Sequence, residues 1–250
     1  MFIHSLKLID IHLYFFGFYQ FHVQSIFDTA TGKRGLENRC EQLGFCHAGT
    51  MQTAIGICRM MELRDNGVLV ASYAYNGKGE RVRKTTGSVT TDYVYDEGGQ
   101  LIGEYTGSRS REYVWLADVP VAMIETTSAT TEIYYLYVDH LNTPRFAADA
   151  SGTVVWRWDS DPFGNGAANE DPDADTDLVT INLRFAGQQF DAESGTHYNY
   201  FRDYDPVLGR YLQSDPIGLA GGLNTYGYVL QNPIKYTDPS GLWVPQLTGR

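Results

Sequence analysis

Hydrophobic and polar residues alternate with a period of two from about residue 70 onward, which is typical of half-buried β-strands. Tyr73-Ala-Tyr75 places two rings on one face of such a strand, and Tyr93-Val-Tyr95 repeats the pattern 20 residues later. Asn76-Gly77 follows the first pair, and Asp96 follows the second. Because Asn or Asp near Gly is typical of a tight turn, the pattern predicts antiparallel hairpins of about 20 residues each.

The repeat continues through the middle of the chain. A single hairpin cannot bury its apolar face, so several hairpins must pack together. We therefore expect an all-β fold of repeated antiparallel hairpins, with residues 66–182 as the hairpin repeats. Three further aromatic pairs recur at intervals of 20 to 22 residues: Tyr113-Val-Trp115, Tyr135-Leu-Tyr137 and Trp156-Arg-Trp158.

Residues 1–65 lack this repeat and differ in composition. They carry no net charge, whereas the rest of the chain carries the whole net charge of −11, and the change falls near Asn66-Gly67. We expect an irregular, atypical segment that is disordered or partly helical, in which glycines interrupt a helix over Leu36–Glu62. The segment also holds all three cysteines, whose spacing lacks the paired element of a zinc site, so we expect free thiols and no metal. The residues concerned are Cys40, Cys46, His47 and Cys58.

The charge balance argues against several classes of partner. The 250 residues include 19 Lys and Arg against 30 Asp and Glu, which disfavours a nucleic-acid-binding surface. No run approaches the roughly 18 uncharged apolar residues of a membrane span, so we expect none. Lys7 and Asp10 interrupt the apolar start of the chain, so we expect no signal peptide and a cytoplasmic location. No pattern points to a cofactor.

Longer motifs accompany the aromatic pairs. The Tyr-x-Tyr-Asp-x-x-Gly period, with Asp139–Arg145 (DHLNTPR) and Asp159–Gly164 (DSDPFG), resembles the tyrosine/aspartate (YD) repeats of Rhs proteins and of the related teneurins and toxin-complex C subunits. Residues 183–242 resemble the Rhs repeat-associated core. The runs that carry this second resemblance are Arg184–Gln188, Asp191–Pro206, Gly209–Leu219, Gly221–Tyr228, Asn232-Pro233 and Asp238–Leu242.

The resemblance implies a hollow β-shell around a C-terminal toxin, with the core closing one end and cutting the chain after its last Asp-Pro-x-Gly-Leu. In this sequence the cut falls between Leu242 and Trp243. The resemblance assigns an aspartyl-protease-like pair to Asp203 and Asp215, with Arg202 holding their geometry. Two close carboxylates cannot both ionise, so one activates a water while the protonated one polarises the carbonyl. We expect a single turnover, because folding itself supplies the orientation.

Two alternatives to a self-cleaving core stay open. Aspartate beside Pro or Gly is usually a turn former, and on that interpretation the chain is a catalytically inactive structural segment of a shell. A cell-surface carbohydrate-binding module is the other, with Tyr137, Trp156 and Trp158 as its stacking surface. The acidic stretch Asn169–Asp177 lacks the glycine and distal glutamate of a calcium loop, so we expect a solvated loop.

The resemblance also implies partners. Residues 243–250 stand where full-length relatives carry a toxin domain, so we expect a vestigial tail there and a chain without its toxin. Other shell segments are the remaining partners, and intact relatives would be secreted or at the cell surface. Because so few repeats cannot close a shell, we expect open sheet edges that favour self-association.

Overall fold

The structure, a computed structural model, describes residues 20–24, 36–42 and 58–242. Within these ranges sixteen strands form two antiparallel sheets, and the strands of each sheet follow the order of the sequence. The first sheet contains β1 (Gln20–Gln24), β2 (Leu36–Gln42), β3 (Cys58–Asp65), β4 (Val68–Tyr75), β5 (Arg81–Thr86), β6 (Val89–Tyr95), β7 (Leu101–Thr106), β8 (Arg109–Leu116), β9 (Val119–Thr126), β10 (Thr131–Val138), β11 (Pro144–Ala148) and β12 (Val154–Arg157). The second contains β13 (Gln189–Asp191), β14 (Thr196–Asn199), β15 (Arg202–Asp205) and β16 (Arg210–Tyr211), and two short 3-10 helices follow, η1 (Gly218–Gly221) and η2 (Val229–Gln231). The all-β prediction is confirmed.

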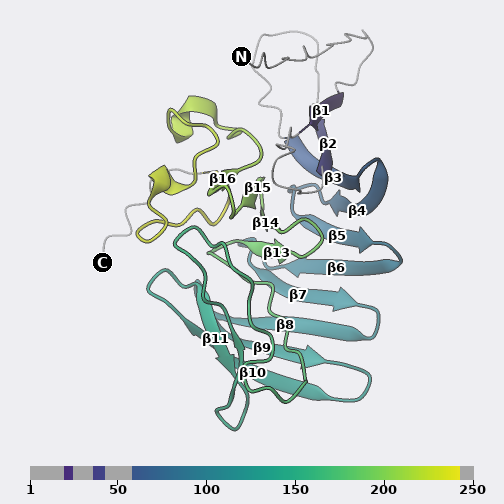
Figure 1. Ribbon diagram of the computed structural model, residues 1–250, viewed down its shortest axis with the longest axis vertical. Helices are drawn as coiled ribbons and strands as arrows, with labels where there is room; N and C mark the ends of the chain where they lie inside the picture. Colours follow the sequence, from purple (N-terminus) through teal and green to yellow (C-terminus); the bar gives the residue numbers. More distant parts are fainter. Residues whose placement is uncertain (1–19, 25–35, 43–57, 243–250) are drawn as a thin grey trace, which may run out of the picture.

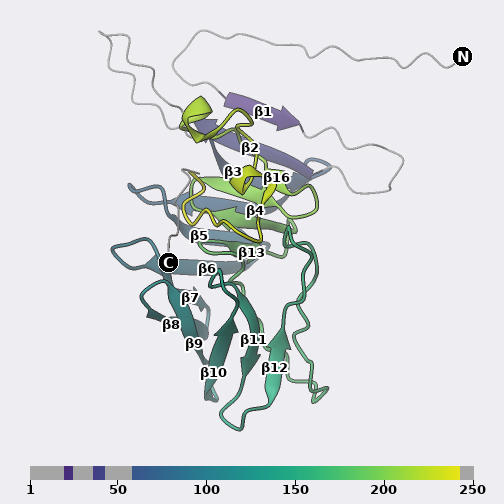
Figure 2. The same cartoon turned by 90° about the vertical axis from the view of Figure 1, so that its left-hand side faces the viewer.

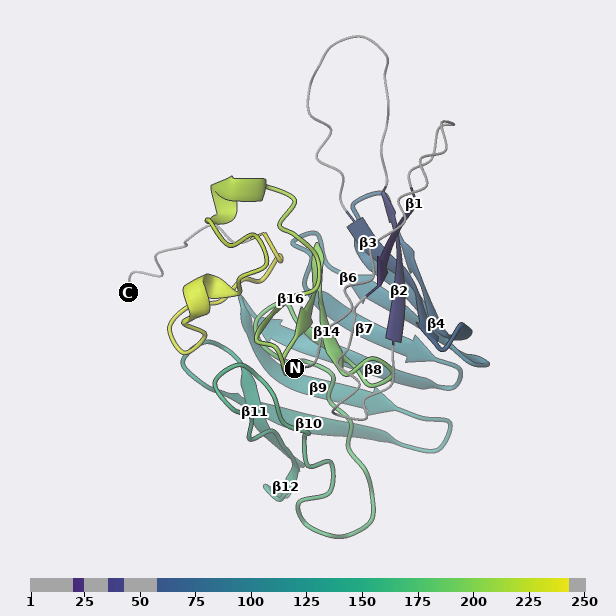
Figure 3. The same ribbon diagram turned by 45° about the horizontal axis from the view of Figure 1, so that its top comes forward.

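The large sheet is a curved wall, and the chain after β12 folds back against its inner face. Figure 1 shows the wall from β3 to β10 with the green to yellow C-terminal part on one side of it. Figure 2 shows that part in front of β3 to β6, and Figure 3 shows the wall bending around it. The core therefore lies between the two sheets, and its largest fully buried rings are those of Trp156, Trp158, Tyr204, Tyr211 and Tyr228.

One turn recurs along the chain and explains the Asp or Asn of each repeat. The Asp96 carboxylate accepts a hydrogen bond from the backbone N–H of Gln100 at 2.9 Å, and Gly99 between them has a φ of 86°. The Gly99 N–H donates to the Asp96 carbonyl oxygen at 3.2 Å. Glycine adopts this left-handed backbone at little cost, which explains the Gly of the motif. The same turn closes residues 76–80, 139–143, 149–153 and 161–165.

The second ring of each of the first three aromatic pairs ties neighbouring hairpins together. Each donates a hydrogen bond to a backbone carbonyl 14 or 15 residues earlier in the chain. Since these carbonyls belong to the preceding hairpin, every repeat is bonded to the one before it. The donors and acceptors are Tyr75 and Met60 at 2.7 Å, Tyr95 and Arg81 at 2.9 Å, and Trp115 and Leu101 at 2.8 Å.

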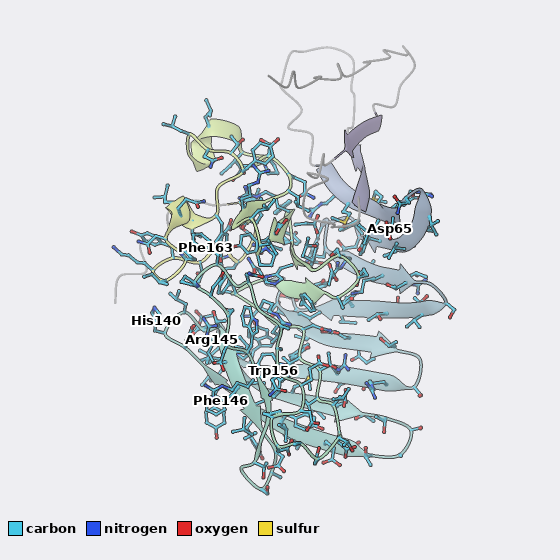
Figure 4. All side chains as sticks on the ribbon, viewed as in Figure 1. Asp65, His140, Arg145, Phe146, Trp156 and Phe163 are labelled. Atoms are coloured by element: carbon cyan, nitrogen blue, oxygen red, sulfur yellow. The ribbon has the colours of Figure 1, made fainter. Side chains whose placement is uncertain are left out.

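The fourth aromatic pair faces the opposite way from the first three. Tyr135 and Tyr137 are 47% and 49% exposed on the outer face of β10, and Leu136 fills the inner position. The ring of Phe146 stacks on Tyr137, with 4.4 Å between the centroids. Figure 4 shows Phe146 on the outer side of β11. An aromatic pair at the expected interval therefore does not fix which face of the strand it occupies.

The fifth pair, Trp156 and Trp158, is completely buried, with 0% exposure for both side chains. Figure 4 shows Trp156 between the two layers. The Trp158 indole N–H donates to the Gly166 carbonyl oxygen at 2.8 Å. Neither ring can stack on a sugar, so the carbohydrate surface that includes them is wrong. Their burial follows from the chain folding back over β12, a contact that a strand pattern alone does not reveal.

The change in composition at Asn66-Gly67 does not mark the edge of the sheet. These two residues form the turn between β3 and β4, and β2 pairs in turn with β3. The helix expected over Leu36–Glu62 is wrong, because the described residues in that range form β2 and part of β3. Predictions for the cysteine cluster and for the start of the chain fall on residues or side chains outside the described part.

The Asp139–Arg145 motif joins the wall to the C-terminal part. The Asp139 carboxylate accepts the N–H groups of the turn and pairs with Arg145, whose guanidinium Nε lies 2.9 Å away. The Arg145 guanidinium also lies 5.3 Å from the ring centroid of Trp158. His140, at the periphery in Figure 4, places its Nε2 2.8 Å from the carbonyl oxygen of Ile234. Across the described residues, no helix has the length and apolar character needed to cross a bilayer.

Candidate functional site

The second sheet presents two chemically different faces because successive residues of a strand point to opposite sides. In β15, Arg202 and Asp203 are adjacent and therefore point apart. Arg202 is paired in register with Asn199 of β14, and Asp203 with Tyr198. The face that carries Arg202 lies over the C-terminal loops, and the face that carries Asp203 lies over the wall. The predicted residues Arg202 and Asp203 thus belong to two separate environments.

Arg202 is the centre of the first environment. Its Nη2 lies 2.9 Å from Asp215 Oδ2 and 3.2 Å from Asp238 Oδ2, and all three side chains are almost fully buried. The guanidinium carbon lies 3.6 Å from the ring centroid of Tyr211. Tyr211 Oη donates to the same Oδ2 of Asp238 at 2.7 Å. One cation thus holds two carboxylates together, since a buried carboxylate must be paired or hydrogen-bonded.

The final segment of the described chain, residues 238–242, runs through this cluster. The backbone N–H of Leu242 donates to Asp238 Oδ1 at 3.1 Å, and Arg202 Nε donates to the carbonyl oxygen of Gly241 at 2.5 Å. Asn199 Nδ2 donates to the Asp238 carbonyl oxygen at 2.9 Å. The peptide group between Gly241 and Leu242 is therefore bonded on both sides, by the arginine and by a carboxylate. Burial raises the pKa of Asp238 and is the largest influence on it.

Two glycines allow this close approach. Gly241 has a φ of 69°, and a Cβ built on it would collide with the carbonyl oxygen of Asn199. Gly187 has a φ of 79°, and a Cβ there would collide with the carbonyl oxygen of Pro239. Any larger residue at either position meets backbone, which cannot rotate away as a side chain can. The matched Gly residues of the core motifs are thus explained by packing of the 238–242 segment.

Asp203 occupies the second environment, against the wall. Its Oδ2 accepts a hydrogen bond from Gln213 Nε2 at 2.5 Å, and its backbone N–H donates to Gln213 Oε1 at 2.7 Å. Burial raises the pKa of Asp203 to about 6, against the lowering effect of the Gln213 hydrogen bond and of Arg81. A carboxyl with that pKa exchanges its proton near neutral pH, which is a property of general acids and bases.

The structure brings together Arg202 and Asp215 of the predicted set and places Asp203 apart from them. It adds Asp238, which precedes a proline and is therefore expected to form a turn, together with Tyr211 and Asn199. The turn role is also real, because Asp238 accepts the Leu242 N–H and Asp215 Oδ1 accepts the Ile217 N–H at 3.0 Å. Trp243, on the far side of the predicted cut, lies outside the described residues.

The acidic loop contributes a separate group of carboxylates. One ligand oxygen from each of Asp171, Asp173 and Asp175 lies within 4.8 Å of the others, and the side chains are exposed or half-exposed. The backbone N–H of Asp175 donates to Asp171 Oδ1 at 3.0 Å, as in a turn. This arrangement is what a solvated loop between strands produces, and the solvated-loop interpretation stays a prediction.

Comparisons with known proteins agree with the architecture. A profile of the Teneurin YD-shell family matches residues 118–234. The toxin protein Tse5 of Pseudomonas aeruginosa is 40% identical over 113 residues, which is 45% of this chain and 8% of that protein. The double-stranded DNA deaminase toxin A of Burkholderia cenocepacia is 38% identical over 122 residues, 48% of this chain and 8% of that protein. The chain thus spans a small part of these relatives.

Solved structures extend the similarity to most of the chain. The crystal structure of TcdB2-TccC3 without its hypervariable C-terminal region superposes on 84% of this chain and 10% of its own, with a TM-score of 0.55 and 18% identity. That likeness concerns the fold. The curved wall of hairpins, its Asp/Asn turns and the small sheet on the inner face define the fold of a YD-repeat shell. Within that class of fold, the sequence comparisons support an Rhs-type protein.

Proposed function

We propose that this chain is a shell segment and self-cleaving core of an Rhs-type toxin, and that it hydrolyses its own Leu242–Trp243 peptide bond. The observation that carries the proposal is the position of Arg202. Its guanidinium contacts Asp215, Asp238 and the Gly241 carbonyl oxygen, so a buried carboxylate pair is joined directly to the segment that ends at Leu242. A reacting bond held in one orientation by the folded chain needs no separate substrate-binding step.

In the proposed reaction, a water attacks the carbonyl carbon of Leu242 and the bond to the Trp243 nitrogen breaks. One carboxylate takes the proton of the water, and a protonated carboxyl polarises the carbonyl and then supplies the proton for the leaving amine. Asp215 is one member of the pair. The resemblance suggests Asp203 as the other member, and its pKa of about 6 suits either role. The geometry favours Asp238, whose Oδ1 is 3.1 Å from the Leu242 nitrogen.

Intact mass of the purified protein tests the proposal. The parent is compared with Asp215→Asn, Asp203→Asn and Asp238→Asn. Asp161→Asn is the matched control. Asp161 caps an exposed turn, and Asn76 caps a turn of the same kind elsewhere in the chain, so asparagine should be tolerated there. We expect the parent and the control to lose residues 243–250 and Asp215→Asn to keep them. Whichever of Asp203→Asn and Asp238→Asn also keeps them identifies the second carboxyl.

A full-length parent, or equal cleavage of the parent and Asp215→Asn, would contradict the proposal. The competing function is a catalytically inactive structural segment. Its support is that Asp215 and Asp238 both accept backbone N–H bonds in turns, so closure of the loop explains their burial without any reaction. In that case all the variants would have full-length masses and the Asn substitutions would change only stability.

The relatives named as toxins support a proposal for the partner. In longer proteins of this architecture, the segment after the cut would be a toxin domain, and the wall and other shell segments would surround it. Contacts between copies are a further prediction, because a sheet that does not close leaves outer strands available for pairing. Sedimentation of the purified chain over a range of concentrations tests this second point.

A further inference from the structure

The junction between the second sheet and the wall contains buried charge that the proposed reaction does not use. Arg81 of β5 and Asp191 of β13 form an ion pair of 2.5 Å in which each side chain is only 2% exposed. Lys84 Nζ adds a second contact with Asp191 at 2.8 Å and a contact with Glu193 at 3.1 Å. Tyr73 Oη donates to Glu193 at 2.9 Å. The wall supplies the cations, and the core module supplies the anions.

Arg81 also holds the strand beside the candidate site. Its guanidinium carbon lies 4.3 Å from the ring centroid of Tyr198 in β14, and its backbone N–H donates to Tyr198 Oη at 2.9 Å. Tyr198 is the register partner of Asp203 in β15. Arg202, which contacts Asp215, is the next residue along that strand. Arg81 of the wall thus contacts the register partner of Asp203, and Asp203 is adjacent to Arg202 at the centre of the other environment.

The charges at this junction act on Asp203 in opposite directions. Arg81 lowers the pKa of Asp203, and Asp191 raises it. Removing one member of a buried pair leaves the other uncompensated and shifts the neighbouring titrations. The titratable and charged groups that face Asp203 are Arg59 of β3, Tyr75 of β4, Arg81 of β5, Asp191 of β13 and Tyr198 of β14.

We infer that Arg81 is a positioning residue for the core: by binding Asp191 and Tyr198 it fixes β14 and β15, so that the core is competent only in a chain whose wall has formed. The effect on cleavage rests on the proposed function, whereas the role of Arg81 in holding β14 and β15 does not. A core that waits for its wall would not release the segment after Leu242 before the surrounding sheet exists. Arg81 touches no reacting atom, so its effect is carried by the strands it holds.

The test uses Arg81→Met, Asp191→Leu and the double variant. Arg81→Met leaves Asp191 paired with Lys84, and the double variant leaves Lys84 paired with Glu193, so both retain compensated charge. Arg83→Met is the matched control, since Arg83 lies on the same strand but forms an exposed pair with Asp92. Each variant is also made in a background that carries Asp215→Asn and is expected not to cleave. The Asp203 carboxyl is titrated in that background by carbon NMR, a measurement that does not depend on cleavage.

We expect Arg81→Met to raise the Asp203 titration midpoint and Asp191→Leu to lower it, with the double variant close to the parent. Opposite shifts would show that both charges face Asp203, and the hydrogen exchange of β14 and β15 tests whether Arg81 holds these strands. We also expect faster amide hydrogen exchange in β14 and β15 for Arg81→Met, and cleavage slowed on the order of 10- to 100-fold. Unchanged titration and exchange in Arg81→Met would overturn the inference. A parent that does not cleave would instead refute the proposed function, and the NMR result would still decide the role of Arg81.

Discussion

Replacing Asp203 by asparagine should make the free energy of unfolding less sensitive to rising pH. Burial raises the pKa of Asp203 to about 6 in the folded chain, whereas a solvated aspartate has a pKa of about 3.9. The folded state therefore holds the proton more tightly than the unfolded state. Between about pH 4 and about pH 6 the unfolded chain ionises first, so the free energy of unfolding falls as the pH rises.

The size of this effect follows from the two pKa values. At about 1.4 kcal/mol per pH unit, their separation corresponds to about 3 kcal/mol of lost stability above pH 6, of which about 2 kcal/mol falls between about pH 4.5 and about pH 8. The asparagine that Asp203→Asn introduces does not titrate, and its side-chain oxygen can still accept the hydrogen bond of Gln213 Nε2 that Asp203 accepts. The substitution therefore removes the titration while it keeps the local geometry.

Urea unfolding at the two pH values measures the difference. Both proteins carry Asp215→Asn so that they keep the same length, and Asp161→Asn in the same background is the control for an exposed turn aspartate. We expect Asp203→Asn to gain about 2 kcal/mol relative to its background on going from the lower to the higher pH. Equal pH dependence with and without Asp203 would refute the account of this carboxyl as buried and difficult to ionise.

Three pairs of substitutions test the packing and the turns of the fold by urea unfolding. Gly241→Ala should lower the free energy of unfolding by at least about 2 kcal/mol, and Gly195→Ala by about 1 kcal/mol. The two glycines share a φ near 70°, but only at Gly241 would the added Cβ meet backbone atoms. Tyr95→Phe should cost about 1–3 kcal/mol through its lost carbonyl hydrogen bond, whereas Tyr135→Phe, on an exposed ring, should stay within about 0.5 kcal/mol. Asp96→Ala should cost about 1 kcal/mol and Asp96→Asn almost nothing, since asparagine caps the same turn elsewhere; equal losses would show that the turn does not depend on the cap.

The repeat and its turns could be predicted from the sequence because they are local. Asp96 and Gly99 lie three residues apart and form one turn, so their spacing alone specifies the backbone. The interval between Tyr73 and Tyr93 similarly indicates two strands of one sheet. The face occupied by Tyr135 could not be predicted, because it depends on the register of β10 against β9 rather than on the interval.

The candidate site was harder to predict because its contacts join distant parts of the chain. Arg202 meets Asp238 across 36 residues, and no spacing rule separates that aspartate from an ordinary turn former. The adjacency of Arg202 and Asp203 misled in a similar way, since neighbours on a strand face opposite sides. A β-strand assignment for residues 202–205 would have been the available signal for their separation. The burial of Trp156 likewise depends on the chain returning over β12.

Cleavage in water enriched in heavy oxygen tests the central claim most directly. The full-length chain is collected in denaturant before it can fold, refolded in the labelled solvent and analysed by intact mass and by sequencing of the new C-terminal peptide. Hydrolysis by the core predicts a chain that ends at Leu242 with one heavy oxygen in its new carboxylate, and no such product from Asp215→Asn. A chain that stays full length, or that ends at Leu242 in both proteins alike, would contradict the account.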